Sequence, residues 1–175
     1  MKKVHLGCGN YILPDWVNVD IVDHPKILKH DISTGLPFED NSVDFFFSEH
    51  FLEHLSKEHG IKLIKEIHRC LKSKGVSRTV VPDLDYLVKA YNENNLAAYS
   101  AISWKTDSRG DMLNYGMTNW SHRYMYNIEE LALIHKLSNF KTFYFTEHKK
   151  SKYTELNGIG HRVYSGELSF ESIKD

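Results

Sequence analysis

A glycine loop and an acidic residue lie close together near the start of the sequence. A short apolar run, VHL, leads into Gly7, Cys8 and Gly9, and a second run, VNVD, ends on Asp20. Glycines let backbone N–H groups approach a ligand, and a carboxylate that ends the next strand can accept hydrogen bonds from ribose hydroxyls. Ile12 stands where G-x-G-x-x-G needs its third glycine, and no P-loop motif occurs. A plain turn with a surface aspartate is the structural alternative.

The stretch SEHFLEHL (48–55) carries a second group of residues able to do chemistry. It contains His50-x-x-Glu53-His54, which matches the H-x-x-E-H pattern of inverted zinc metallopeptidases. On a helix, His50 and His54 would lie on one face, as zinc ligands require. A third, acidic ligand on a later helix would also be needed, and no residue stands out for it. We therefore expect no metal here, and keep a zinc hydrolase as an alternative.

Aromatic side chains are concentrated in residues 95–126, interleaved with Asn, Ser and His. A sugar or another planar polar ligand would stack on such rings, although packing in the core is the alternative for each of them. The candidates for binding such a ligand are Trp104, Trp120, His122 and Tyr124. His161 and Arg162 could close over the site from the far end of the chain. For Cys8 we favour a small packing residue over a nucleophile.

Short apolar runs alternate with helical patterns over the first 90 residues or so. We expect strands at 4–6, 17–22, 43–47 and 76–81, and helices at 57–72 and 83–91. Ser56 is the predicted N-cap of the first helix, with Gly75 just beyond its end. A further helix at 127–138, capped by Asn127, precedes strands at 141–147 and 167–173. The pattern predicts a three-layer α/β sheet, mostly parallel with an antiparallel last strand.

The first connection in this sheet is unusually short. A parallel crossover commonly holds a dozen residues or more with a helix, whereas only GNYILPDW joins the first two strands, with Pro14 inside it. We therefore expect the first helix to be shortened or absent. Tyr11, Ile12 and Trp16 would then cover the apolar surface that this helix would otherwise protect.

Length and charge limit the class of protein. The 175 residues suffice for a single domain, and a formal charge of -1 argues against a nucleic-acid binder. The first residues lack the apolar run of a signal peptide, and no stretch has the length of a membrane-spanning helix. Cys8 and Cys70 are too few for a disulfide framework. We expect a cytoplasmic protein, with no membrane partner and with a homodimer left open.

Four motifs in order resemble the class I S-adenosylmethionine-dependent methyltransferases. They are LGCG, NVD, HDISTGLPFEDNSVDFFFSEHFLEHL and LKSKGVSRTVVPDL, and together they span about residues 4–91. The pattern LGCG…W-x-NVD is similar to that of a small predicted-methyltransferase branch, as is SHRYMYNIEEL at 121–131. The resemblance implies a Rossmann-like methyltransferase fold in one domain, 1–175, with 95–126 as an insertion on the acceptor side.

The resemblance also implies roles for particular residues. Asp20 would bind the ribose hydroxyls of S-adenosylmethionine, and Asp31 would lie beside its adenine. The whole implied cofactor-binding set is Gly7, Cys8, Gly9, Asp20, Ile21, Asp31, Ile32, Ser48 and Glu49. His50 would lie at the reacting centre as a general base or as a donor that orients the acceptor. Helix capping or packing at the core edge is the structural alternative for His50.

The expected activity is transfer of a methyl group from S-adenosylmethionine to a hydroxyl or amine of a small molecule or glycan. The local excess of acids between Asp15 and Glu58 suits a cofactor with a sulfonium cation. A cofactor-binding protein without catalysis, acting as a partner or sensor, is a second hypothesis, and the zinc hydrolase is a third.

Overall fold

The computed structural model describes residues 1–96, 105–162 and 166–175. Within them, seven strands form one sheet in the order β3-β2-β1-β4-β5-β7-β6. Their bounds are β1 (Lys3–Leu6), β2 (Val17–Asp20), β3 (Ile27–Lys29), β4 (Val43–Glu49), β5 (Leu71–Pro82), β6 (Thr142–Thr146) and β7 (Glu167–Ile173). Strands β3, β2, β1, β4 and β5 are parallel neighbours, and β7 runs antiparallel to β5 and β6. The predicted sheet is confirmed.

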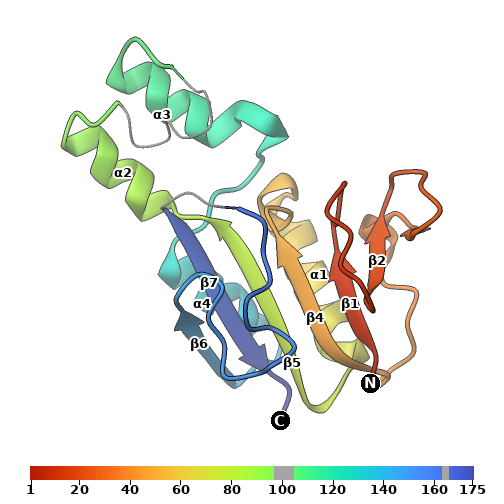
Figure 1. The fold of residues 1–175 in the computed structure, drawn as a ribbon. Helices are drawn as coiled ribbons and strands as arrows, with labels where there is room; N and C mark the ends of the chain where they lie inside the picture. Colours follow the sequence, from red (N-terminus) through yellow and green to blue (C-terminus); the bar gives the residue numbers. More distant parts are fainter. Residues whose placement is uncertain (97–104, 163–165) are drawn as a thin grey trace.

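The helices are α1 (Lys57–Cys70), α2 (Leu84–Asn92), α3 (Arg109–Thr118) and α4 (Ile128–Leu137). The side chains of Ser56 and Asn127 cap α1 and α4, as the sequence predicts, by accepting hydrogen bonds from the third residue of each helix. Helices α1 and α4 cover one face of the sheet, while α2 and α3 pack on each other beyond the end of β5 (Figure 1). None of the helices in the described ranges has the length and apolar run that a membrane crossing requires.

Loops cover the opposite face of the sheet. Successive residues of a strand point to opposite sides, so Phe46 packs in the cluster that includes α1 and α4, whereas Phe47 packs in a second cluster. Leu13 and Leu156, which belong to the loops after β1 and β6, complete that second cluster. The connection between β1 and β2 contains no helix. The first helix is thus absent, and loops form the third layer.

The short first connection covers the sheet much as its sequence predicts. Tyr11 and Trp16 pack against the second cluster, and the ring of Trp16 contacts that of Phe47 at a centroid distance of 6.4 Å. The fully inserted residue is Leu13 rather than Ile12, which is only half-buried. Asn18 fixes this loop, because its side chain donates to Leu13 O and accepts from Leu13 N at 3.0 Å each.

A buried arginine fastens the later loop to the sheet. Arg78 of β5 is fully buried and donates through Nε to Glu171 Oε1 of β7 at 3.0 Å. Its other nitrogens donate to the backbone carbonyls of Leu156 (2.7 Å) and Lys150. Tyr144 Oη donates to the second oxygen of Glu171 at 2.8 Å. The residues between β6 and β7 are therefore held against the sheet by a charged group as well as by apolar contacts.

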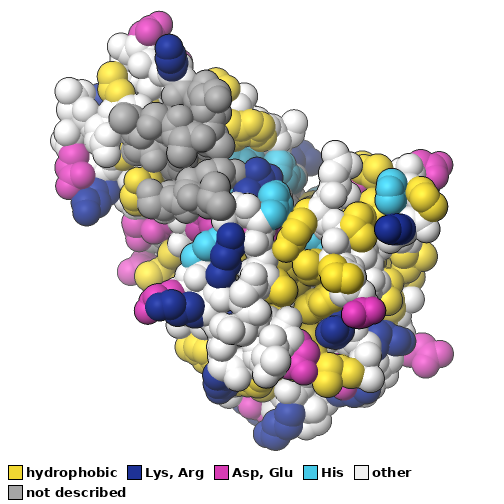
Figure 2. Space-filling view, viewed as in Figure 1, with side chains coloured by type: hydrophobic (Ala, Val, Ile, Leu, Met, Phe, Trp, Pro, Cys, Tyr) yellow, Lys and Arg dark blue, Asp and Glu magenta, His cyan; other side chains and the backbone are white. Residues whose placement is uncertain are grey.

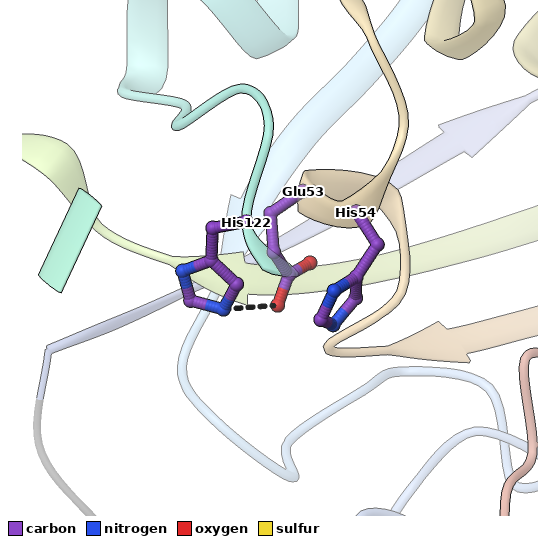
Figure 3. Close-up of side chains that lie close together, drawn as sticks. All are labelled: Glu53, His54 and His122. Atoms are coloured by element: carbon purple, nitrogen blue, oxygen red, sulfur yellow. Dashed lines mark ion pairs between the residues drawn. The ribbon is translucent and has the colours of Figure 1, made fainter. Parts of the chain in front are cut away.

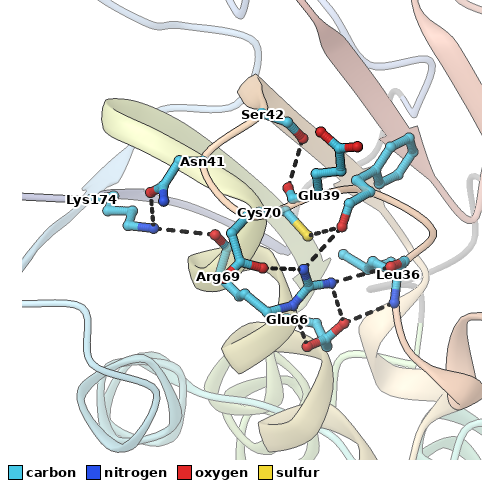
Figure 4. A network of polar contacts seen from close by, with 10 residues as sticks. Leu36, Glu39, Asn41, Ser42, Glu66, Arg69, Cys70 and Lys174 are labelled. Carbon is cyan, nitrogen blue, oxygen red and sulfur yellow. Dashed lines mark hydrogen bonds and ion pairs between the residues drawn. The ribbon is translucent and has the colours of Figure 1, made fainter.

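A polar network attaches the segment before β4 to the end of α1 (Figure 4). Arg69 donates to Glu66 in the same helix and to the backbone carbonyls of Leu36 and Phe38. Glu66 in turn accepts from Leu36 N at 3.0 Å, and Arg69 pairs with Asp40 at 2.6 Å. The network fixes the approach of the chain to β4, the strand that ends at the cavity described below.

Some boundaries differ from the predicted ones. Helix α1 ends at Cys70, and β5 begins directly at Leu71, so Gly75 lies inside a strand rather than after a helix. A Cβ on Gly75 would lie 2.9 Å from the carbonyl oxygen of Lys72, which explains the glycine there. Strand β3 and helix α3 were not predicted, because β3 is three residues long and α3 lacks a clear apolar stripe.

Burial of a histidine makes the fold sensitive to acid. His135 is fully buried, its Nδ1 lies 2.7 Å from Leu131 O, and its Nε2 has no partner among the described residues. Burial lowers the pKa of His135 to about 4. The unfolded chain takes up this proton near pH 6.5 and the folded chain only near pH 4, so acidification through this window favours unfolding, by up to about 3 kcal/mol.

We expect His135→Gln to flatten the pH dependence of stability between pH 6.5 and 4. The measurement is urea unfolding at a series of pH values, with the exposed His24→Gln as the matched control. An unchanged slope in His135→Gln would show that His135 does not carry the acid sensitivity.

Candidate active site

A cavity of about 720 Å³ opens at the carboxyl ends of β1, β2, β3 and β4. The strand order reverses between β1 and β4, which is where open α/β sheets bind ligands. Figure 2 shows histidine side chains gathered beside the end of the molecule that carries α2 and α3. Of the residues predicted for the site, those that line the cavity are Gly7, Cys8, Gly9, Asp20, Ile21, Asp31, Ile32, Glu49 and His50.

The two glycines of the loop have different surroundings. Gly7 and Gly9 have φ values of +63° and +49°. A Cβ on Gly7 would lie 2.2 Å from the ring of Phe51, so the bare backbone is needed for packing. A Cβ on Gly9 would meet nothing within 4 Å, because that position faces the cavity. Gly9 therefore leaves space for a ligand next to the backbone.

Asp20 connects the glycine loop with the end of β2. Its Oδ2 accepts a hydrogen bond from Gly9 N at 2.8 Å, and its Oδ1 accepts from Val22 N at 3.2 Å. Each carboxylate oxygen offers about two lone-pair sites, so acceptor capacity remains for hydroxyl groups in the cavity. Asp31, which caps the 3-10 helix η1 (Ile32–Thr34), accepts from Ser33 N at 2.9 Å, and the hydrogen bonds with Ser33 lower the pKa of Asp31.

Glu49 ends β4 as a buried carboxylate at the cavity wall. Its Oε2 lies 2.6 Å from His161 Nδ1 and accepts from His161 N at 3.0 Å. Its Oε1 has no hydrogen-bond partner among the described residues. Since His161 and Arg162 both line the cavity, the loop between β6 and β7 does reach the site. The arrangement leaves one buried oxygen of Glu49 without a hydrogen-bond donor in the cavity wall.

His50 follows Glu49 in a left-handed conformation, with φ of 52°. Its Nε2 lies 2.9 Å from Glu167 Oε1, and its Nδ1 lies 3.4 Å from Glu53 Oε1. Burial, assisted by the charge of Arg162, lowers the pKa of His50 to about 3, so the ring is neutral at pH 7. Burial also raises the pKa of Glu167 to about 7. A non-glycine residue held at positive φ beside a cavity is typical of functional sites.

The helical zinc motif predicted as an alternative does not form. Residues Leu52–His54 make a single 3-10 turn, η2, rather than an α-helix, and His50 lies outside it in the left-handed region. His50 and His54 are therefore not presented as neighbours one α-helical turn apart.

Three of the four predicted acceptor-binding residues are described, and the cavity lining does not include them. Trp104 falls outside the described residues. Trp120 is 46% exposed, with its ring 5.4 Å from that of Tyr115. Tyr124 packs against the core and donates to Glu130 at 3.0 Å. His122 faces Glu53 instead, and Ser48 is buried within the sheet. Among the described residues of the aromatic segment, none lines the cavity.

Several lining residues were not predicted. They are His5, Asn10, Tyr11, His30, Ser33, Phe51, His54 and Leu55. His5 could have been found, because it precedes Gly7 by two residues and so shares its face of β1. Burial lowers the pKa of His5 to about 4. Glu167, the partner of His50, is 117 residues away in sequence, and no motif around it indicated a site residue.

Comparison with known proteins agrees with this geometry. Residues 5–78 match the family described as a methyltransferase domain. The fold is similar to that of a SAM-dependent methyltransferase from Archaeoglobus fulgidus (TM-score 0.61, 16% identity, 99% of this chain and 86% of that one). It is also similar to one from Thermotoga maritima (TM-score 0.63, 17% identity, 99% and 82%).

A third similar structure is a methyltransferase from Haloferax volcanii in complex with the Trm112 methyltransferase activator (TM-score 0.56, 14% identity, 98% of this chain and 81% of that one). No curated protein sequence matches the chain. The match over residues 5–78 covers the glycine loop, Asp20 and the end of β4, which are the parts that line the cavity. Over residues 5–78 the chain matches the methyltransferase-domain family, its fold is that of the class I S-adenosylmethionine-dependent methyltransferases, and S-adenosylmethionine is the cofactor that these two findings indicate.

Proposed function

We propose that the chain transfers the methyl group of S-adenosylmethionine to a hydroxyl or amine of a small molecule or glycan. The observation that carries the proposal is the cavity lined by Gly9, Asp20 and Glu49 at the point where the strand order reverses. The residues fit the cofactor: Gly9 leaves open space, Asp20 has lone pairs for ribose hydroxyls, and the carboxylate of Glu49 in the cavity wall suits a cationic group. The free Cys8 and Cys70 agree with a reducing, cytoplasmic setting.

When bound, the cofactor would supply an activated methyl group. A lone pair of the acceptor bonds to the methyl carbon, the bond between that carbon and the sulfur breaks, and the sulfur keeps the bonding electron pair. The acceptor must also lose a proton, and His50 is our candidate to take it, because it lines the cavity and is neutral. Glu167 faces Nε2 and would hold the ring in place, which leaves Nδ1, 3.4 Å from Glu53 Oε1, as the nitrogen that would take the proton. The remaining work of the protein is to align donor and acceptor.

The test is calorimetric titration with S-adenosylhomocysteine of the wild type, Asp20→Asn and Asp20→Ala. We expect Asp20→Asn to weaken binding by roughly tenfold or more, since a hydrogen bond to a charged acceptor contributes about 1.5–3 kcal/mol. Asp20→Ala should bind more weakly still, because it also frees Gly9 N. The exposed Asp15→Asn, in the same connection, is the matched control and should bind as the wild type does.

Wild-type affinity in Asp20→Asn would refute the ribose assignment, and no binding by the folded wild type would refute the cofactor site. Turnover is then measured with hydroxyl and amine acceptors. Binding without turnover across such a panel would instead favour the partner or sensor hypothesis.

A further inference from the structure

A buried carboxylate surrounded by histidines lies behind the cavity. The side chain of Glu53 is 0% exposed, and neither of its oxygens accepts a hydrogen bond within the described ranges. Glu53, His54 and His122 each place one ligand atom within 4.8 Å of the others. Figure 3 shows the carboxylate between the two rings, with His122 approaching from a separate segment. Burying a carboxylate without hydrogen-bond donors costs several kcal/mol of folding free energy. A bound cation, or protonation of the carboxylate, would offset this cost.

The backbone holds these side chains together. The carbonyl oxygen of Glu53 accepts from Arg123 N at 2.8 Å and from Tyr124 N at 3.1 Å. Glu53 and His54 belong to the turn η2, which follows β4, whereas residues 122–124 follow η4 (Asn119–Ser121). The cluster is therefore built where two distant segments are fastened to each other, and does not depend on mobile surface side chains.

The hydrogen bond of His122 assigns its protons. Nδ1 lies 3.1 Å from the carbonyl oxygen of Gly116, which can only accept, so Nδ1 carries the hydrogen. Nε2 then presents a lone pair toward Glu53 Oε1 at 3.9 Å. Metal-binding histidines commonly donate their second nitrogen to a carbonyl in this way. Two ligands on one zinc ion lie about 3.3 Å apart, so a small contraction would bring these atoms onto a common ion.

A second group of possible ligands is partly satisfied by protein contacts. It consists of Glu49, His148 and Glu167. Glu49 Oε2 pairs with His161, and the two oxygens of Glu167 pair with His50 and His148 at 2.9 and 3.0 Å. The Glu53 cluster differs because neither oxygen of its carboxylate has a hydrogen-bond partner within the described ranges, whereas one oxygen of Glu49 and one of Glu167 do.

We propose that Glu53, His54 and His122 bind one divalent transition-metal ion of the zinc type. Two imidazoles and one carboxylate are the ligand set of catalytic zinc sites that keep a further position open. We place that position on the cavity side, because His54, one of the three ligands, lines the cavity. The next step rests on the proposed function: the open position would bind the hydroxyl oxygen of the methyl acceptor. The substrate class would then be an alcohol.

The test is titration of the metal-stripped protein with Co²⁺, followed by its visible absorption, and with Zn²⁺ by calorimetry. We expect one ion per chain, and roughly tenfold or greater loss of affinity in His122→Ala and in Glu53→Gln. His148→Ala probes the second cluster, and the exposed His24→Ala controls for adventitious binding; both should bind as the wild type does. Circular dichroism and the Tm of each variant establish that it is folded.

No stoichiometric binding by the wild type would overturn the proposal, as would equal affinity in folded His122→Ala, or loss confined to His148→Ala. A rise in Tm with Zn²⁺ that is absent in His122→Ala would support it. These measurements need neither cofactor nor acceptor, so they can fail while the methyltransferase proposal stands. For the acceptor role, His122→Ala should keep its affinity for S-adenosylhomocysteine and lose turnover.

Discussion

Replacing Arg78 with methionine is expected to lower the free energy of unfolding by about 3–5 kcal/mol, the largest stability effect that we predict. Arg78 and Glu171 are both fully buried. Without the guanidinium, the hydroxyl of Tyr144 is the one donor that Glu171 keeps among the described residues, and the backbone carbonyls of Leu156 and Lys150 lose the hydrogen bonds from Arg78. The loss of stability arises more from leaving the Glu171 carboxylate buried without its charged partner than from losing the attraction between Arg78 and Glu171.

Urea unfolding of a small set of variants separates these causes. In Arg78→Met/Glu171→Leu the stranded charge is gone, so the double variant should recover a large part of the stability that Arg78→Met loses. The exposed pair Lys29–Asp23 is the matched control, and Lys29→Met should change stability by less than about 1 kcal/mol. A loss below about 1 kcal/mol in Arg78→Met would mean that the loop is held by its apolar contacts alone.

Replacing Gly9 with alanine is expected to abolish cofactor binding while leaving the protein folded. The new methyl group would fill the space beside the backbone that faces the cavity. The substitution should also lower the free energy of unfolding by about 1 kcal/mol, because residue 9 has a positive φ. Gly158→Ala is the matched control, because Gly158 also has positive φ and open space around it but does not line the cavity.

Calorimetry with S-adenosylhomocysteine and urea unfolding are the two measurements for this pair. We expect similar losses of stability in both variants, and loss of binding in Gly9→Ala alone. Equal binding by the two would show that the cofactor does not approach the Gly9 backbone. Gly7→Ala should be less stable than either, since its Cβ would overlap the ring of Phe51.

The sequence was sufficient for most of the fold because local patterns determined it. Residues 57–70 repeat their apolar side chains at helical spacing, and Ser56 and Asn127 begin helices by direct capping. The short first connection predicted the missing helix. What replaces that helix could not be predicted, because Leu13 and Leu156 meet only through the fold. Helix α3 was missed since packing against α2, rather than its own periodicity, supports it.

The site divides in the same way. Gly7, Gly9 and Asp20 belong to one continuous motif and all line the cavity, as predicted. The partners of the reactive side chains come from distant segments: Glu167 reaches His50, and His122 reaches Glu53. The aromatic segment was assigned to the acceptor from its composition and its place after the fifth strand, and neither specifies which way a ring points.

The loop between β6 and β7 closes the apolar face of the sheet and also supplies His161 to Glu49 in the cavity wall. A helical layer could slide as a unit, but this loop cannot lift without exposing Phe47 and Val80 to water. Opening of the binding site on this side therefore also exposes the core. Amide exchange in β4 and β5 should slow when the cofactor binds, and the substrate should enter from the opposite side, past His54 and Leu55.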